Sequence, residues 1–329
     1  MNETKIIDKF NRVHDYLRIS LTERCNLRCF YCMPEEGIKL RQRTQFMSFD
    51  EVIQMAKTFV SLGVTKIRLT GGEPLVRNDS KKIIRELSKL PVELAITTNG
   101  ILVNDFIPVL KESNIKNINV SLDSLKKETF NSITRRDYFD KVISNINLLL
   151  QNKFHVKINV VLIKGVNDNE VTDFVEWTKD KNIHIRFIEF MPFDGNKWNW
   201  SRGVSLDNIL NKTRSHFGEK NIIRLLDGKN DTAKNYTIAS HTGTFAVISS
   251  ITNPFCDNCN RMRLTADGKM KNCLFSASET DLLSELRAGK DIKPLILNTV
   301  WNKKAWRAGI NTIEDFSKQK NRTMVAIGG

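Results

Sequence analysis

The six cysteines of this sequence fall into two groups of three, one near each end of the chain. The groups are Cys25, Cys29 and Cys32, and Cys256, Cys259 and Cys273. A cytosolic chain of this size rarely needs disulfides, so close thiols indicate metal or cluster ligands rather than covalent cross-links. The sequence therefore predicts two separate metal or iron–sulfur sites.

The first group has CxxxCxxC spacing and follows a predicted strand, so it lies at the carboxyl end of that strand, where such folds place active sites. Three thiolates on a short loop can hold three irons of a four-iron cluster and leave the fourth iron open for a ligand. A closed zinc site would need a fourth nearby Cys or His, and none lies between Cys32 and Ser48. We therefore expect a cluster that binds a further molecule.

The second group combines a CxxC pair with a more distant cysteine, and an Asp-Gly dipeptide at 267–268 lies between them. Asp-Gly between alternating stretches predicts a hairpin, which would return Cys273 to the CxxC pair. Arg261 and Arg263 lie beside this site in the sequence. Three ligands again suit a cluster with one open iron, and a zinc site completed by a histidine such as His241 is the alternative.

Hydrophobic periodicity predicts six strands, most of them separated by helices. The strands are expected at Tyr16 to Ser20, Lys66 to Thr70, Glu93 to Thr97, Asn117 to Leu122, His155 to Leu162 and His184 to Phe190. The helices are expected at Ser48 to Leu62, Ser80 to Leu90, Asp105 to Ser113, Phe139 to Gln151 and Asp168 to Lys181. A repeated strand–helix–strand order indicates a parallel sheet. The expected fold is α/β, an incomplete six-stranded TIM-like (β/α)6 barrel over residues 1–220, with a smaller module that carries the second cluster over residues 221–329.

Alternation along these strands separates an apolar face from a polar one, because residues two apart share a face. The apolar face holds Leu17, Ile19, Ile67, Leu69, Leu94, Ile96, Ile118, Val120, Ile158 and Val160. The polar face holds Arg18, Ser20, Arg68, Thr70, Thr97, Asn119, Ser121, Lys157, Asn159 and Arg186. A barrel filled by packing alone would show bulky aliphatic residues inside, so we expect an enclosed polar ligand. The alternative is an open sheet with one wetted face.

The composition is that of a globular protein, and the formal net charge of +14 favours anionic partners such as nucleotides or nucleic acid. The start of the sequence lacks a signal-peptide core, and no apolar run reaches the length of a membrane span. We therefore expect a cytoplasmic protein without membrane contact.

The CxxxCxxC run, with Tyr31 before its last cysteine, resembles the signature of the radical S-adenosylmethionine superfamily. Gly71-Gly72-Glu73-Pro74 after the second strand resembles the motif with which that superfamily receives the methionine amine, and Glu73 is suited to an ammonium group. The resemblance implies that a reduced cluster passes one electron to the sulfonium and releases a 5′-deoxyadenosyl radical.

Nearly the whole chain resembles the GTP 3′,8-cyclase family, also called molybdenum cofactor biosynthesis protein A. The matching segments are LRISLTERCNLRCFYCMP, IRLTGGEPLVR, TTNG, INVSLDSL, IRFIEFMPFDGN, CxxCNRMRLTADG with its later cysteine, and the terminal Gly-Gly. The resemblance implies a lyase with two [4Fe–4S] clusters and S-adenosylmethionine that converts GTP to 3′,8-cyclo-7,8-dihydro-GTP, the first step of molybdenum cofactor biosynthesis.

The same resemblance assigns roles to individual residues. It places S-adenosylmethionine on Tyr31, Gly72, Glu73, Thr97, Ser121, Lys157 and Met191. It places GTP on Arg18, Arg68, Thr97, Lys157, Arg186, Arg261, Met262 and Arg263, so Thr97 and Lys157 are candidates for either molecule. Catalytic roles fall to Arg18, Arg261, Arg263, Gly328 and Gly329, the two glycines forming a tail that enters the active site.

The resemblance also implies partners: a flavodoxin- or ferredoxin-like electron donor, a cyclic pyranopterin monophosphate synthase that receives the product, and a second copy in a homodimer. Two alternatives remain. One is another two-cluster radical enzyme that modifies a peptide, although such enzymes generally carry more cysteines in this module. The other is a zinc-binding nucleic-acid module, which the α/β pattern and the lack of interleaved aromatic and basic residues disfavour.

Overall fold

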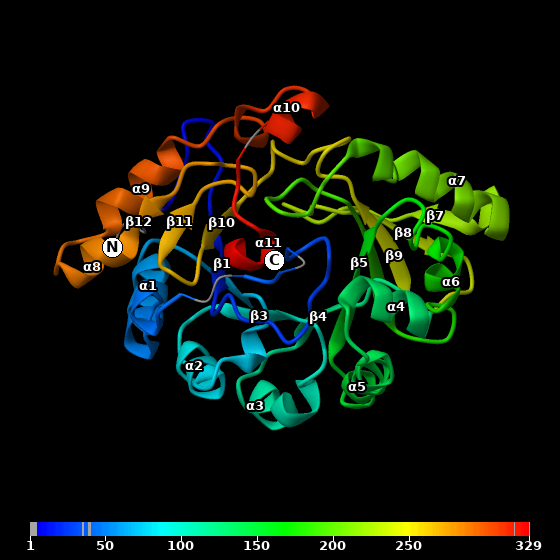
Figure 1. Cartoon of the computed structure of the whole chain (residues 1–329), viewed down its shortest axis with the longest axis horizontal. Helices are drawn as coiled ribbons and strands as arrows, with labels where there is room; N and C mark the ends of the chain where they lie inside the picture. The colour runs from blue at the N-terminus through cyan, green and yellow to red at the C-terminus, as the bar shows by residue number, and fades with distance from the viewer. Residues whose placement is uncertain (1–4, 35, 39–40, 319, 329) are drawn as a thin grey trace.

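The computed structural model describes residues 5–34, 36–38, 41–318 and 320–328, and its centre is a single twelve-stranded sheet. The strands follow the order β12-β11-β10-β1-β2-β3-β4-β5-β6-β9-β8-β7. Figure 1 shows this sheet as a curved wall, with helices along its outer side and the C-terminal helix α11 near the centre of the view.

The six predicted strands are present as β1 to β6, side by side in chain order and parallel. Their bounds are Tyr16–Ser20 (β1), Lys66–Thr70 (β2), Glu93–Thr98 (β3), Asn117–Ser121 (β4), His155–Leu162 (β5) and Ile183–Glu189 (β6). The ends differ from the expected ones by a single residue where they differ at all. The prediction of a parallel α/β sheet is confirmed.

Strands from the C-terminal third extend this sheet at both sides. β10 (Arg261–Leu264) lies parallel beside β1, and β9 (Thr244–Ile248) lies parallel beside β6. The outer strands are antiparallel: β11 (Lys269–Lys271) and β12 (Thr280–Asp281) beyond β10, and β8 (Lys234–Ile238) and β7 (Ile222–Arg224) beyond β9. The sheet therefore has more strands than the six expected. The strands after residue 221 are short, and their periodicity was too weak to assign them to this sheet. The strand order ends at β12 and β7, so closure into a barrel is not confirmed.

Helices connect most of the parallel strands, as expected. They are α1 (Phe49–Ser61), α2 (Ser80–Leu87), α3 (Ile107–Glu112), α4 (Lys127–Thr134), α5 (Phe139–Gln151), α6 (Val171–Glu176), α7 (Leu206–Phe217), α8 (Leu282–Arg287), α9 (Lys293–Trp301), α10 (Ile313–Lys318) and α11 (Met324–Ile327). The predicted capping box is present: the Ser48 side chain accepts from the Glu51 amide, and the Glu51 carboxylate accepts from the Ser48 amide. The sequence reading missed α4, whose two buried apolar residues are too few for a clear periodic pattern.

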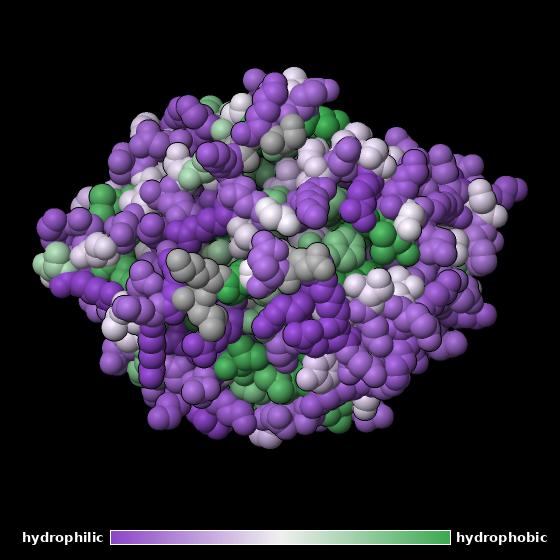
Figure 2. All heavy atoms as spheres, viewed as in Figure 1, coloured by the Kyte–Doolittle hydropathy of each residue, from purple (hydrophilic) through white to green (hydrophobic). Residues whose placement is uncertain are grey.

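The core lies between the apolar face of the sheet and these helices. Leu17, Ile19, Ile67 and Leu69 are fully buried there, as the alternation predicts. A second, smaller core gathers Ile251, Phe275, Ile310 and Phe316 around the C-terminal segment. The face seen in Figure 2 is mainly hydrophilic, and among the described residues no helix is both long and apolar enough to cross a membrane.

Candidate active site

A row of basic side chains crosses the inner face of the sheet where the first and last parts of the chain meet. In the pairing register, Arg18 of β1 is opposite Arg68 of β2 on one side and Arg263 of β10 on the other. Tyr16, two residues earlier, is opposite Arg261. Since paired residues of neighbouring strands share a face, these side chains lie together on the inner face of the sheet.

The register partner of Arg68 on β3 is Ala95, and beyond it the same face of the remaining parallel strands carries further polar side chains. Thr97, Asn119 and Lys157 are register partners on β3, β4 and β5, and Ser121, Asn159 and Arg186 form a second such line that ends on β6. Arg186 donates to the Asn159 side chain at 2.6 Å. The polar face predicted from alternation is thus one continuous surface, which we call the basic chamber.

The basic chamber concentrates positive charge. Burial, followed by repulsion from neighbouring cations, lowers the pKa of Arg18 to about 10 and that of Arg186 to about 9, and lowers the pKa of Lys157 and, strongly, of Arg263. The groups that offset this charge are Tyr16, Asp231 and Cys273, rather than a set of carboxylates among the strands. A polyanion bound in the basic chamber would relieve the repulsion.

Several buried polar atoms of the basic chamber have no hydrogen-bond partner within the part of the chain that the structure describes. They are Thr97 Oγ1, Asn119 Oδ1, Arg186 Nε and Arg261 Nη2. Because buried polar groups in proteins are nearly always hydrogen-bonded, these atoms indicate a place for a ligand with both donors and acceptors.

The first thiol group lies on the loop after β1. Burial raises the pKa of Cys25 to about 11, and burial together with Asp123 and the neighbouring thiols raises the pKa of Cys29 and Cys32. Thiolates at these three positions therefore require a cation. Gly72 packs against this loop: its amide donates to the Thr22 carbonyl at 2.7 Å, and a Cβ there would lie 2.5 Å from the Arg24 carbonyl oxygen. The glycine allows close approach to the cysteine loop.

Glu73 is buried, and its carboxylate accepts from the Leu75 amide (3.1 Å), the Thr98 hydroxyl (2.8 Å) and the Asn99 amide (2.6 Å). Burial raises its pKa to about 7 despite these bonds. The Asn99 side chain in turn donates to Asn26 at 2.7 Å and contacts the Cys25 sulfur at 3.8 Å. Glu73 therefore connects the ends of β2 and β3 to the first thiol loop.

Tyr31 and Asp123 form a buried pair beside the same thiols. The Tyr31 hydroxyl donates to Asp123 at 2.6 Å, and the second Asp123 oxygen accepts from the Val161 amide at 2.8 Å. Burial raises the pKa of Asp123 to about 6. The pair sets the position of Tyr31, a residue expected at the S-adenosylmethionine site, whereas no role for Asp123 was predicted from the sequence.

The second thiol group lies around the start of β10, and the predicted hairpin is present: Leu264 pairs with Met270 and Arg263 with Lys271. Burial would raise the pKa of Cys259, but Arg261 and Lys303 outweigh it and lower that pKa to about 6. Lys303 Nζ is 3.3 Å from the Cys259 sulfur. A thiolate is therefore favoured at Cys259, which is the form that binds metal.

His241 does not belong to this group. Its ring contacts Phe217 and Thr178 at the turn between β8 and β9, and these strands lie toward the other end of the strand order from β10. Within the described residues, no three His, Cys, Asp or Glu side chains are arranged to chelate a single ion. The geometry does not support a zinc site with His241.

The C-terminal tail reaches the basic chamber. The Gly328 carbonyl accepts from Arg263 Nη1 at 3.0 Å and from the Thr70 hydroxyl at 3.3 Å. Gly328 has a φ of +86°, and a Cβ there would lie 2.6 Å from Ser20 Cβ, so only glycine fits without a shift. Gly329 lies outside the described residues.

Two predicted contact residues lie apart from the strand face. Met262 is fully buried in the hydrophobic core and is the register partner of Leu17, so its side chain faces away from Arg261 and Arg263. Alternation puts this side chain on the apolar face, so the expected contact between Met262 and the substrate would have to involve its backbone. Met191 follows β6 and packs against the small C-terminal core.

The chain matches two families along its length: residues 19–178 match the Radical SAM superfamily, and residues 183–308 match Molybdenum Cofactor Synthesis C. It is 48% identical to the mitochondrial GTP 3′,8-cyclase of Arabidopsis thaliana, covering 98% of this chain and 83% of that protein. It is 41% identical to the GTP 3′,8-cyclase of Peptoclostridium acidaminophilum, covering 100% of this chain and 99% of that protein. The chain belongs to the GTP 3′,8-cyclase family.

Other members of the family are longer: this chain covers 52% of molybdenum cofactor biosynthesis protein 1 of Dictyostelium discoideum, to which it is 44% identical. Among solved structures, Streptococcus suis SuiB bound to S-adenosylmethionine matches with a TM-score of 0.62 over 97% of this chain and 71% of that one. At 14% identity this match supports a shared fold alone.

Sequence reading missed several residues of this cyclase-family site. Tyr16, Asn99, Asp123 and Lys303 all contact predicted site residues. Tyr16 could have been found, since it lies two residues before Arg18 on the same face of β1. The others depend on contacts between loops distant in the sequence, which periodicity does not reveal.

Proposed function

We propose that this chain is a GTP 3′,8-cyclase that converts GTP to 3′,8-cyclo-7,8-dihydro-GTP in molybdenum cofactor biosynthesis. The observation that carries the proposal is the basic chamber, which joins the cysteine loop after β1 to the cysteine hairpin of β10 and β11 through Arg18 and Arg263. The identity of 41% to a cyclase of matching length supports it.

The two thiol groups fit two [4Fe–4S] clusters, each with three protein ligands. The ligands would be Cys25, Cys29 and Cys32 for the first cluster and Cys256, Cys259 and Cys273 for the second. With S-adenosylmethionine bound, the first cluster supplies the one-electron chemistry that generates a 5′-deoxyadenosyl radical. The chain's own task is to bind, orient and shield the reactants.

S-adenosylmethionine would lie over the carboxyl ends of the strands near the first thiol loop. Glu73 offers a carboxylate with spare acceptor sites for the ammonium group. The residues assigned to this cofactor are Tyr31, Gly72, Glu73, Ser121 and Met191, with Thr97 and Lys157 assigned to the cofactor or the substrate.

GTP would occupy the basic chamber with its triphosphate among the cations. Guanidinium groups bind phosphate through paired hydrogen bonds and stay charged in a buried site, which suits Arg18, Arg68, Arg186, Arg261 and Arg263. Arg261 has an Nη2 without a partner among the described residues, and Arg263 donates its Nη1 to the Gly328 carbonyl. Both groups are suited to contact the purine or its phosphates. Such preoriented donors would stabilise charge that develops when C3′ joins C8.

The wider assignments belong to the same proposal. Residues 1–220 would form the partial barrel and residues 221–329 the module with the second cluster. We further propose a flavodoxin- or ferredoxin-like electron donor, transfer of the product to a cyclic pyranopterin monophosphate synthase, homodimer formation and a cytoplasmic location.

The decisive experiment is anaerobic incubation of the reconstituted protein with S-adenosylmethionine, a reductant and each purine nucleotide in turn, followed by mass analysis. Among the purine nucleotides, we expect only GTP to give a cyclised product together with 5′-deoxyadenosine. The reconstituted protein should contain about eight irons per chain. Replacing all three cysteines of either group with alanine should remove about half of the iron. The proposal would be contradicted if none of the nucleotides gave a cyclised product, or if the unsubstituted protein held about four irons.

A further inference from the structure

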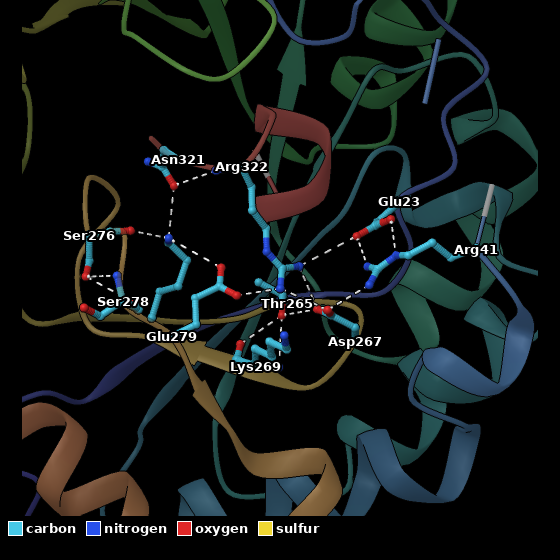
Figure 3. A network of polar contacts seen from close by, with 11 residues as sticks. Glu23, Arg41, Thr265, Asp267, Lys269, Ser276, Ser278, Glu279, Asn321 and Arg322 are labelled. Atoms are coloured by element: carbon cyan, nitrogen blue, oxygen red, sulfur yellow. Dashed lines mark hydrogen bonds and ion pairs between the residues drawn. The ribbon is translucent and has the colours of Figure 1, made fainter. Parts of the chain in front are cut away.

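A network of ion pairs joins the C-terminal tail to both thiol-bearing segments. Arg322 donates to both oxygens of Asp267, at 2.9 and 3.0 Å, and to Glu279 at 2.5 Å. Asp267 also accepts from Arg41 at 3.0 Å, and Arg41 is ion-paired with Glu23. Figure 3 shows Arg322 and Arg41 approaching Asp267 from different sides. We call these five residues the tail network.

The members of the tail network come from three separate segments. Glu23 and Arg41 belong to the connection after β1 that holds the first thiol group, and Asp267 lies at the turn between β10 and β11. Arg322 lies just before α11. Asp267 and Glu279 expose only 5% and 14% of their side chains, so Arg322 compensates carboxylates that are largely removed from water.

The neighbouring Asn321 fixes the same point of the tail. Its amide donates to Asp194 at 3.0 Å, its side chain donates to the Leu274 carbonyl at 3.0 Å, and its oxygen accepts from Lys271 at 3.1 Å. Leu274 directly follows Cys273. The start of the tail is therefore anchored on the segment that carries the second thiol group.

From this anchor, α11 leads directly into the basic chamber. Val325 and Ile327 are each 1% exposed, and Gly328 then hydrogen-bonds to Arg263 and Thr70. Only five residues lie between Arg322 and Gly328, so the position of the guanidinium restricts where Gly328 can lie.

We propose that Arg322 is a positioning residue that, through its bidentate pair with Asp267, holds Gly328 in the basic chamber. This inference rests on the proposed function. Through Arg322, the carboxylates of Asp267 and Glu279 would help to position the tail in the active site. This role would explain why charged residues are found at positions where apolar residues would cost less to bury.

The test is a double-mutant cycle in the full-length, cluster-loaded protein. The variants are Arg322→Ala, deletion of residues 328–329, and both together. We expect each single change to lower the rate of product formation, Arg322→Ala by about tenfold or more, the factor that a charge-assisted bidentate contact contributes. If Arg322 acts through the tail, the double variant is no slower than the deletion alone. Independent, multiplying losses would overturn the proposal.

A second readout does not depend on catalysis. Carboxypeptidase should trim the C-terminus of Arg322→Ala faster than that of the unsubstituted protein, as followed by mass spectrometry. Equal trimming rates would contradict a positioning role. If the unsubstituted protein yields no cyclised product, the proposed function fails while this trimming result still decides the role of Arg322.

Arg85→Ala is the matched control. Arg85 of α2 also makes a two-point contact with a carboxylate from a distant segment, at 3.1 and 3.0 Å from the two oxygens of Glu112 on α3, and neither of these helices holds a member of the tail network. It should change neither trimming nor turnover. Arg322→Lys keeps the charge without the planar fork and should give intermediate values in both assays, and full loss of folded protein in Arg322→Lys would assign Arg322 to stability instead.

Discussion

Arg18 on β1 and Arg263 on β10 occupy the same register position on neighbouring parallel strands. Like charges directly opposite each other on one face of a sheet repel, and burial increases that repulsion. The pairing also brings the two cysteine motifs to adjacent strands, although they are far apart in the sequence. A bound anionic substrate would offset the repulsion between Arg18 and Arg263, which accounts for two buried cations at adjacent positions.

Replacing Arg261 or Arg263 with alanine should separate the two halves of the reaction. We expect cleavage of S-adenosylmethionine to remain largely intact, because the first thiol loop is untouched, while the cyclised product disappears. Quantifying 5′-deoxyadenosine and product in the same anaerobic assay tests this. Retention of full cyclase activity in both variants would refute their proposed role.

Gly328→Ala should lower turnover without lowering iron content. The substitution strains a residue with φ of +86° and puts a Cβ 2.6 Å from Ser20 Cβ, so the tail must move away from Arg263. Gly289→Ala is the control, since Gly289 has φ of +73° but nothing within 4 Å of the added Cβ. Deletion of Gly328 and Gly329 should give the same pattern in turnover and iron assays. Equal turnover of the two alanine variants would argue against a role for the tail.

Much of the site was predictable because it depends on short-range patterns. Alternation along β1 and β2 identified Arg18 and Arg68 as neighbours on a polar face, and the Asp-Gly turn located the hairpin of the second thiol group. Both signals come from residues within one strand or one turn, where local geometry decides the outcome.

What sequence could not supply was the joining of distant segments. β9 and β10 complete the sheet beside β6 and β1, but their short length hides their partners. The burial of the Met262 side chain was not foreseen, because the resemblance covers a continuous motif, whereas alternation divides that motif between two faces. The role of Asp267 as a common acceptor for Arg41 and Arg322 emerges only when three loops meet.

Binding of GTP should weaken above about pH 8 through Tyr16. Burial would raise the pKa of this phenol, but Arg68 and Arg18 outweigh burial and lower it to about 8, and Arg68 Nε donates to its oxygen at 2.6 Å. As pH rises through this value, a phenolate forms and competes with phosphate for the same guanidinium groups. The expected result is a rise in KM for GTP over about pH 8 to 9 that Tyr16→Phe abolishes.

The same lowered pKa of Tyr16 has the opposite effect on the stability of the fold, because it favours the folded state at high pH. The pKa of Tyr16 in the folded protein is about 8, below the ordinary tyrosine value of 10.0, so its deprotonation stabilises the folded state fully above pH 10.0, and this contribution is lost as pH falls through about 8. A KM that rises equally in Tyr16→Phe, or in the control Tyr138→Phe at an exposed position, would assign the pH dependence to another group.

Glu73→Gln should both destabilise the protein and weaken its affinity for S-adenosylmethionine. The carboxylate accepts from Leu75, Thr98 and Asn99, and a glutamine has one oxygen for these donors, so a buried amide loses its acceptor at a cost of about 1–3 kcal/mol. Urea unfolding measures this cost, with the exposed Glu128→Gln as control. A contact with the ammonium group requires in addition a raised KM for S-adenosylmethionine at a temperature where the variant is fully folded. If the free energy of unfolding falls but KM for S-adenosylmethionine is unchanged, Glu73 stabilises the fold without binding the cofactor. Its role would then be limited to connecting β2 and β3 with the cysteine loop.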